Sequence, residues 1–283
     1  MYAHFEGILE RRNISLLTSL SGFSVRRWKL KAVILAGGYG TRLLEETSEV
    51  PKPMIEVGGR PLLWHIMKIF STQGFNEFVV ALGYKADVVK RYFLHYSQLE
   101  SDLTIHTGKR HVEASGDIAD DWKIHLVDTG LDTMTGGRLR RLRNHWDETL
   151  IFTYGDGLSN VDLPKLVEFH KSHGKLATVT AVECPSRFGQ LQFDGDQVKV
   201  FAEKPKASGE WINAGFFVLE PGVLDYIDGD TTVWEGEPCE RLVADGQMMA
   251  YRHEGFWQCM DTLRELRGLR EQWADGEAEW KIW

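Results

Sequence analysis

The chain has 283 residues, of which 43% are apolar, so it is long enough to bury a sizeable core in one or two domains. Lys and Arg total 33 against 41 Asp and Glu, which gives a net charge of -8 and argues against a basic surface for nucleic acid or an anionic membrane. No apolar run approaches the roughly 18 residues that a membrane span needs. We therefore expect small-molecule partners.

Cysteine usage indicates a reducing compartment. Cys184, Cys239 and Cys259 lie far apart and form no CxxC pair, so neither a disulfide framework nor a zinc ribbon is predicted. We expect these cysteines to pack in the interior and the protein to be cytoplasmic. Residues 1–30 do not resemble a signal peptide and are assigned to an N-terminal extension, either disordered or a non-native start, and residues 31–283 to one domain.

Strand and helix patterns alternate from Lys31 onward, which predicts an α/β fold with a mixed, mainly parallel sheet. The region 97–137 is less regular. Aromatic residues at the C-terminus predict packing or a subunit contact. Strands are predicted at 32–35, 78–82, 150–154 and 177–182, alternating and antiparallel strands at 190–202 and 211–219, and helices at 62–73, 86–96, 163–170 and 262–273.

A glycine turn follows the strand at 32–35. Three glycines within residues 37–40 would let backbone N–H groups approach phosphate oxygens, and Arg42 stands beside them. The turn is not a Walker A loop, because no Gly-Lys-Ser/Thr follows, and Leu43 stands where a dinucleotide-binding GxGxxG needs its last glycine. An ordinary glycine turn is the alternative interpretation.

Lys52 lies between Pro51 and Pro53, whose rings fix the backbone on either side. A lysine held in this way can direct its ammonium group at a phosphate. A solvated loop lysine is the common alternative, but a glycine turn with an arginine shortly before it favours a phosphate site.

The segments LAGGYGTRL at 35–43 and PKPM at 51–54 resemble the signature of the sugar-1-phosphate nucleotidyltransferases. Further segments are similar to the cytidylyltransferase branch of that family, and together they span nearly all of residues 31–283 in the family's order. They are WHIMK at 64–68, VDTG at 127–130, MTGGR at 134–138, FTYGDG at 152–157, RFG at 187–189, EKPK at 203–206, NAGFFV at 213–218 and GFWQCMDT at 255–262.

This resemblance implies a reaction in which a hexose 1-phosphate attacks the α-phosphorus of a nucleoside triphosphate and pyrophosphate leaves. In this branch the substrates are CTP and α-D-glucose 1-phosphate, and the CDP-glucose formed feeds deoxysugar and O-antigen synthesis. Because two anions must meet, cationic groups and Mg²⁺ are implied. The resemblance also implies a Rossmann-like sheet flanked by helices with a smaller antiparallel β insertion, and a homo-oligomer that we expect to be a hexamer.

The resemblance assigns roles at the nucleotide end. Arg42 and Lys52 would stabilise the departing pyrophosphate, and Asp156 and Asp261 would hold Mg²⁺. Turn formation for Asp156 and a helix N-cap region for Asp261 are the alternatives. The residues implied in nucleotide binding are Leu35, Ala36, Gly37, Gly38, Tyr39, Gly40, Thr41, Arg42, Lys52, Thr133 and Arg138, of which the last two belong to the segment expected to choose the base.

At the sugar end, Lys204 would contact the sugar phosphate and Glu203 would accept hydrogen bonds from sugar hydroxyls. Tyr154, Asn213 and Gly215 complete the implied sugar-phosphate site, where the glycine permits close approach. An exposed Glu-Lys-Pro turn is the alternative for the first pair, and a bond to the nearby backbone is the alternative for Asn213.

Two other functions stay open from the sequence. A related pyrophosphorylase could use UTP, dTTP or GTP, because the phosphate machinery is shared. A regulatory subunit that binds sugar nucleotides without catalysis would show damage at the phosphate and metal positions, yet Arg42, Lys52, Asp156, Lys204 and Asp261 are all present.

Histidines receive structural assignments. His170 and His173 are expected at a solvated helix terminus, because neither a cysteine partner nor a HExxH pattern accompanies them. His65 is expected to pack within its helix.

Overall fold

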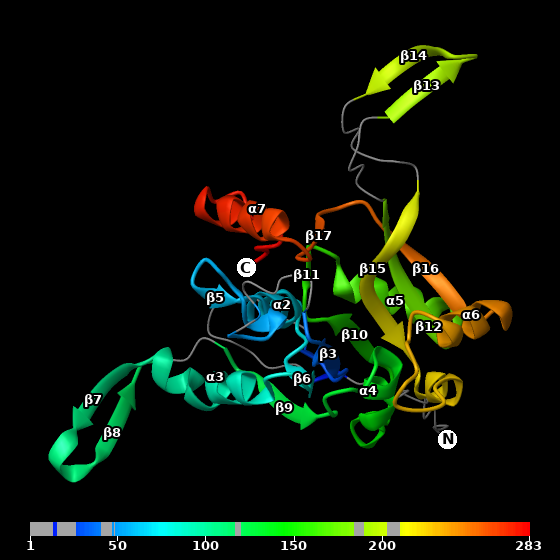
Figure 1. Cartoon of the computed structure of the whole chain (residues 1–283). Coiled ribbons are helices and arrows are strands. Elements are labelled where there is room, and N and C mark those ends of the chain that lie inside the picture. The colour runs from blue at the N-terminus through cyan, green and yellow to red at the C-terminus, as the bar shows by residue number, and fades with distance from the viewer. Residues whose placement is uncertain are drawn as a thin grey trace, which may run out of the picture.

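The computed structural model of the chain describes residues 14–15, 27–40, 47, 49–116, 120–183, 190–202 and 210–283 (Figure 1). A seven-stranded sheet lies at its centre, with the strand order β16-β12-β15-β10-β3-β6-β9. In chain order these strands are β3 (Ala32–Ala36), β6 (Glu77–Leu82), β9 (Lys123–Asp128), β10 (Leu150–Tyr154), β12 (Ala177–Glu183), β15 (Trp211–Leu219) and β16 (Met248–His253).

The sheet is mixed but mainly parallel, as predicted. Strand β3 pairs in parallel with β6 and β10, and β6 pairs in parallel with β9. Strand β15 runs antiparallel to its neighbours β10 and β12, and β12 is parallel to the edge strand β16. The carboxyl ends of β3, β6 and β10 therefore meet at one edge of the sheet.

Side chains of the central strands alternate between two apolar clusters, one on each face of the sheet. In β3, Ile34 points into one cluster, whereas Val33 and Leu35 point into the other. In β15, Phe216 and Phe217 divide in the same way. Both faces of the sheet are thus buried, which explains why its central strands are continuous apolar runs in the sequence.

Helices cover both faces. Apolar side chains of α2, α3, α5 and α7 join the first cluster, and those of α4 and α6 join the second. The predicted Pro-first start is present, since Pro61 is the N-cap of α2, and the helix is followed by Gly74 at φ 91°. The helices are α2 (Leu62–Thr72), α3 (Ala86–Leu99), α4 (Thr135–Arg141), α5 (Leu163–His173), α6 (Glu237–Ala244) and α7 (Leu263–Ala274), with 3-10 turns η2 (Lys52–Met54), η3 (Thr107–Lys109), η4 (Arg143–His145) and η5 (Pro221–Tyr226).

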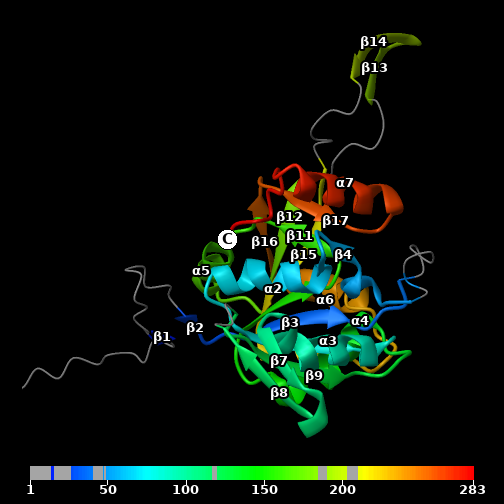
Figure 2. The same ribbon diagram turned by 90° about the vertical axis from the view of Figure 1, so that its left-hand side faces the viewer.

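Small antiparallel pairs surround the main sheet, and two of them stand out from the body in Figure 1; the β13–β14 pair also stands out in Figure 2. These are the β7–β8 and β13–β14 hairpins; the first lies in the region 97–137, whose residue pattern is less regular. Among the described residues, no helix is long and apolar enough to span a membrane. The pairs are β1 (Ile14–Ser15) with β2 (Arg27–Trp28), β4 (Glu56–Val57) with β5 (Arg60–Pro61), β7 (Asp102–His106) with β8 (His111–Ser115), β11 (Gly157–Ser159) with β17 (Trp257–Cys259), and β13 (Gln190–Asp194) with β14 (Gln197–Ala202).

Packing reaches back before Lys31. The Trp28 ring stacks on Phe75, with ring centroids 5.4 Å apart, and its backbone N–H donates to the Gly74 carbonyl at 3.0 Å. Leu30 is buried in the first cluster. Part of the segment assigned to the extension therefore contributes to the core, and residues 1–13 and 16–26 lie outside the described residues.

The C-terminal tryptophans pack on helix α2 through His65. The fully buried His65 ring donates from Nε2 to the Val57 carbonyl at 2.8 Å and accepts at Nδ1 from the Trp280 indole N–H at 3.4 Å. Trp273 and Trp283 lie edge-on or tilted to the same ring. Burial, followed by the charge of Arg60, lowers the pKa of His65 to about 4.

The prediction for the other histidine pair was wrong at His170. This side chain is 1% exposed, with Nδ1 at 2.8 Å from the Thr178 hydroxyl and Nε2 at 3.1 Å from a Glu220 carboxylate oxygen. The helix α5 packs its last turn on β12, so the position is interior although it precedes the helix end. His173 is only partly exposed and bonds the same Thr178 hydroxyl.

We expect His65 to make the fold sensitive to mild acid. Its pKa in the folded chain is about 4 against an ordinary value of 6.5, so the unfolded chain binds the proton more tightly in this window. Its contribution is complete above about pH 6.5 and is lost as the pH falls to about 4, by roughly 3 kcal/mol. Denaturant unfolding of the wild type and of His65→Leu across this range measures it. A wild-type pH slope no steeper than that of His65→Leu would contradict the assignment.

Candidate active site

A cavity of about 510 Å³ opens at the carboxyl ends of β3 and β10. Five separate segments line it: the end of β3 with the glycine turn that follows, the turn η2, the loop before α4 with the start of that helix, the end of β10 with the turn that follows, and the link between β17 and α7. The lining residues are Leu35, Ala36, Gly37, Gly38, Tyr39, Gly40, Lys52, Pro53, Leu131, Asp132, Thr133, Met134, Thr135, Arg138, Tyr154, Gly155, Asp156 and Asp261.

The glycine turn exposes its backbone to this cavity. A Cβ added at Gly38 would meet nothing within 4 Å, whereas one at Gly37 would lie 2.3 Å from the Arg138 guanidinium. Gly40 has φ 65°, in the left-handed region that favours glycine. A glycine is therefore needed at position 37 because a larger residue would collide with Arg138, and at position 40 because of the backbone conformation. Gly38 faces open space.

Arg138 lies behind the turn and is 4% exposed. Burial, and secondarily the charge of Arg141, lowers the pKa of Arg138, but a guanidinium keeps its proton at neutral pH. Its five hydrogen bonds, of 2.7 to 3.1 Å, join the ends of β3 and β6 to the loop that follows β9. The acceptors are the carbonyl oxygens of Gly37, Leu82, Gly130 and Leu131 and the hydroxyl of Thr129.

This geometry changes the interpretation of Arg138. The resemblance implied contact with the nucleotide, and the side chain does line the cavity. Its guanidinium donors, however, are directed at carbonyl groups that shape the cavity wall. A buried positive charge behind the glycine turn also favours an anion in front of it.

Lys52 and two aspartates meet at one end of the cavity. The Lys52 ammonium donates to an Asp156 carboxylate oxygen at 2.7 Å and to an Asp261 oxygen at 2.6 Å, and the three side chains are 12%, 29% and 25% exposed. Burial lowers the pKa of Lys52, but the Asp156 charge and the hydrogen bonds to both carboxylates outweigh it and raise the pKa overall. The lysine is therefore fully charged at neutral pH.

Local strand pairing brings the two aspartates together. Strand β11 pairs antiparallel with β17, with Gly157 opposite Cys259, and the Met260 N–H donates to the Asp156 carbonyl at 2.9 Å. Asp261 directly precedes Thr262, the N-cap of α7, whose side chain and Glu265 form a capping box. The α7 cap is thus Thr262 rather than Asp261, whose carboxylate reaches the cavity.

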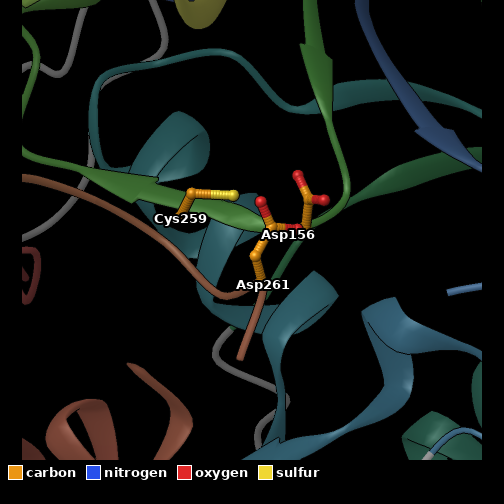
Figure 3. A group of neighbouring side chains, drawn as sticks. All are labelled: Asp156, Cys259 and Asp261. Atoms are coloured by element: carbon orange, nitrogen blue, oxygen red, sulfur yellow. The ribbon is translucent and has the colours of Figure 1, made fainter. Parts of the chain in front are cut away.

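A carboxylate oxygen from each aspartate and the Cys259 sulfur lie within 4.8 Å of one another, and the thiol points toward the carboxylates (Figure 3). Oxygen ligands suit Mg²⁺, so the two aspartates fit this ion, whereas the thiol does not. Burial, together with the charge of Asp156, raises the pKa of Cys259 and keeps the thiol protonated. From the sequence, Cys259 was expected to serve packing alone, and its position beside the carboxylates was not predicted.

The predicted sugar residues that can be placed gather around Tyr154. Gly215 has φ 79°, and a Cβ there would lie 2.6 Å from the Tyr154 ring, so the glycine permits the close approach expected. The Asn213 side chain accepts from the Gly215 N–H at 2.7 Å, which is the backbone bond given as its alternative role. Tyr154 lines the cavity directly, and the other two residues lie behind it.

Several predicted site residues lie outside the described residues. They are Thr41, Arg42, Glu203 and Lys204, together with Cys184.

Other parts of the cavity wall were not predicted from the sequence. The predicted residue Tyr39 donates its hydroxyl proton to Asp132 at 2.7 Å, a contact that links the glycine turn to the loop before α4. Leu131 and Met134 present exposed apolar side chains beside them. No spacing rule connects these positions, because the contact between the two loops depends on the sheet that carries them.

Known proteins with related sequences identify the family. The family model described as nucleotidyl transferase matches residues 31–275. The chain belongs to the nucleotidyl transferase family. The glucose-1-phosphate cytidylyltransferase of Salmonella typhi is 50% identical over 256 residues, which cover 90% of this chain and 100% of that protein. A Bacillus subtilis (strain 168) protein named probable glucose-1-phosphate cytidylyltransferase is 44% identical with the same coverage.

Solved structures agree on the nucleotidyltransferase fold. The crystal structure of HddC from Yersinia pseudotuberculosis superimposes with a TM-score of 0.65 at 22% identity, covering 86% of this chain and 99% of that one. The predicted family and fold class are both confirmed.

We expect Arg138→Ala to lower both stability and nucleotidyl transfer. The substitution removes one donor from each of four carbonyl oxygens, at a cost of about 1–3 kcal/mol, and weakens the link between the glycine turn and the end of β6, where the Tyr84 and Thr129 N–H groups still bond Gly37 and Leu82. Denaturant unfolding and the KM for the nucleoside triphosphate measure the two effects. Arg143→Ala, at an exposed position in the same region, is the control. Wild-type values for Arg138→Ala would rule out a role in shaping the cavity.

Proposed function

We propose that this nucleotidyl transferase is a glucose-1-phosphate cytidylyltransferase, which joins CTP and α-D-glucose 1-phosphate into CDP-glucose and releases pyrophosphate. The likeness to the cytidylyltransferase relatives along their whole length carries the proposal. The glycine turn, Lys52 and the two aspartates support it, because they line one cavity.

In this mechanism the phosphates of CTP lie against the glycine turn, where main-chain N–H groups and the charge of Arg138 favour an anion. Lys52 lines the same cavity and stabilises negative charge on the departing pyrophosphate. By resemblance, Arg42 shares this task, while Lys204 binds the sugar phosphate and Glu203 accepts hydrogen bonds from sugar hydroxyls.

Asp156 and Asp261 would hold Mg²⁺, which neutralises phosphate charge when it is bound. The Lys52 ammonium bridges the two carboxylates, so they lie close enough to share one cation. When the carboxylates hold the metal, Lys52 is available to turn toward the phosphates.

Base choice is assigned to the wall formed by residues 131–138. Leu131, Met134 and Tyr39 give this wall exposed apolar surface of the kind that packs on a base. The alternative substrates UTP, dTTP and GTP would use the same phosphate machinery. A regulatory subunit without catalysis is less well supported, because Lys52, Asp156 and Asp261 retain mutual contacts.

The remaining parts of the proposal are a cytoplasmic enzyme, a role in CDP-deoxysugar and O-antigen synthesis, and a homo-oligomer, with a hexamer as the expected state. The β7–β8 hairpin supports self-association. Leu103, Ile105 and Val112 share one face of the hairpin with Ala114 and are all exposed. A two-stranded hairpin is marginal in water on its own, so an apolar face on it favours a partner surface, here a second copy.

The decisive test is pyrophosphate release by the purified protein with Mg²⁺, glucose 1-phosphate and each of CTP, UTP, dTTP and GTP separately. We expect release with CTP only, and loss of release when a chelator removes the metal. Release with another triphosphate would overturn the base assignment and keep the chemistry. No release with any of them, from folded protein also tested with other sugar phosphates, would favour the regulatory subunit.

We expect Asp261→Asn to abolish magnesium-dependent turnover without unfolding the chain, because one of the two carboxylate ligands loses its charge. Cys259→Ser is the matched control beside it and should retain metal-dependent activity, because the thiol is not a ligand for a hard ion. Turnover against Mg²⁺ concentration and thermal unfolding separate these effects. Wild-type metal dependence in Asp261→Asn would remove this residue from the site.

We expect Ile105→Asp to reduce the oligomer's mass, since a carboxylate on the apolar face opposes burial there. Thr104→Asp, on the opposite face of the same strand, should leave the assembly intact. Light scattering coupled to size-exclusion chromatography measures both. An unchanged mass for Ile105→Asp would place the subunit contact elsewhere.

A further inference from the structure

Glu235 contacts two cavity residues without lining the cavity itself. The Tyr154 hydroxyl donates to one of its carboxylate oxygens, and the Thr135 hydroxyl donates to the other at 2.7 Å. Thr135 and Tyr154 belong to different walls, the loop and first turn of α4 and the end of β10. One carboxylate therefore connects the wall assigned to the base with the residue assigned to the sugar.

The segment that carries Glu235 is firmly held. Its neighbour Trp234 is fully buried, with its ring centroid 5.8 Å from Phe217 and 6.4 Å from Phe152. The Trp234 N–H donates to the Thr135 hydroxyl at 2.9 Å, so that hydroxyl accepts from Trp234 and donates to Glu235. The position of the carboxylate is thus set by buried packing on one side and by a main-chain hydrogen bond on the other.

Two glycines of the MTGGR segment make this arrangement possible. A Cβ at Gly137 would lie 2.4 Å from the Asp230 carbonyl oxygen, and one at Gly136 would lie 2.8 Å from the Thr232 carbonyl oxygen. The Gly137 N–H donates to the Thr232 carbonyl at 3.2 Å. Only glycine lets the backbone before Glu235 approach α4 so closely. The MTGGR segment therefore packs against the loop that carries Glu235 and also forms part of the cavity wall.

Tyr154 depends on its partners for orientation. Burial, followed by the charge and hydrogen bond of Glu235, raises the pKa of Tyr154 well above its usual range, so its hydroxyl keeps its proton and donates it to the carboxylate. On its other side the tyrosine ring lies against Gly215. The hydroxyl is therefore fixed both in place and in the direction of its proton.

We infer that Glu235 is a positioning residue, which fixes the Tyr154 hydroxyl at the hexose side of the cavity and ties it to Thr135 on the nucleotide side. The inference rests on the proposed function for the identity of the hexose phosphate. Because the hydroxyl proton is committed to Glu235, the Tyr154 oxygen can act toward a sugar hydroxyl only as a hydrogen-bond acceptor.

A double-mutant cycle of Glu235→Ala and Tyr154→Phe tests this inference. We expect each single change to raise the KM for glucose 1-phosphate roughly fivefold, the effect of a hydrogen bond of about 1 kcal/mol, and to leave the KM for CTP nearly unchanged. The double variant should be no worse than either single one. Glu235→Gln should fall between wild type and Glu235→Ala, since its amide oxygen accepts from one hydroxyl only.

Glu237→Gln is the matched control, an exposed glutamate two residues further along in the first turn of α6, and should behave as wild type. Additive effects in the cycle, or equal increases in both KM values, would overturn the inference. The same double-mutant cycle, applied to the midpoints of denaturant unfolding, measures the contact between Glu235 and Tyr154 without substrate. An absence of coupling in that measurement would also overturn the inference. An inactive wild type would instead count against the proposed function, with the unfolding cycle still deciding the contact.

Discussion

Hydrogen bonding by the Arg138 guanidinium organises the edge of the sheet on which the cavity depends. Where parallel strands end, their last carbonyl groups lose the neighbouring strand that would satisfy them, and burial makes that loss costly. Arg138 satisfies Gly37 after β3, Leu82 at the end of β6 and two carbonyls of the loop after β9. One side chain therefore joins three strand ends, together with the Tyr84 and Thr129 N–H groups, which also bond the Gly37 and Leu82 carbonyls.

Charge in the cavity is arranged in two layers. The inner layer is Arg138. Its hydrogen-bond partners are carbonyl groups and a hydroxyl, and none of them is a carboxylate that would neutralise its positive charge. The outer layer is the Lys52, Asp156 and Asp261 group, where one cation is shared by two anions. A triphosphate entering this space meets the positive charge of Arg138 behind the turn and that of Lys52 in the cavity wall, which suits a reaction that moves negative charge along the phosphate chain.

The sequence was informative where the residue pattern of one segment and the structural reason for that pattern lie in the same segment. Apolar runs predicted β3, β6 and β10 because both faces of those strands are buried, and the Gly-Asp-Gly turn placed Asp156 correctly on the cavity. It was uninformative where a contact joins distant segments. His170 looked like a helix end but lies against β12, and Glu235 has no local pattern that links it to Tyr154 about 80 residues earlier. The β7–β8 hairpin was not predicted because every residue in its strands is exposed, so the strands contain no continuous apolar run and only a short alternation of polar and apolar residues.

The long spacing between partners also affects how the protein acquires its site. Lys52 and Asp261 are separated by 209 positions, and His65 and Trp280 by 215, so both contacts close loops that include most of the chain. Closing such loops lowers the conformational entropy of the chain before the contacts they bring together can offset that loss. Folds rich in distant contacts therefore form slowly. The core strands can pair before α7 docks, but the carboxylate of Asp261 reaches the cavity only when β17 and α7 are in place. The active site is thus completed only when β17 and α7 have docked on the core, which makes nucleotide binding a sensitive reporter of full folding.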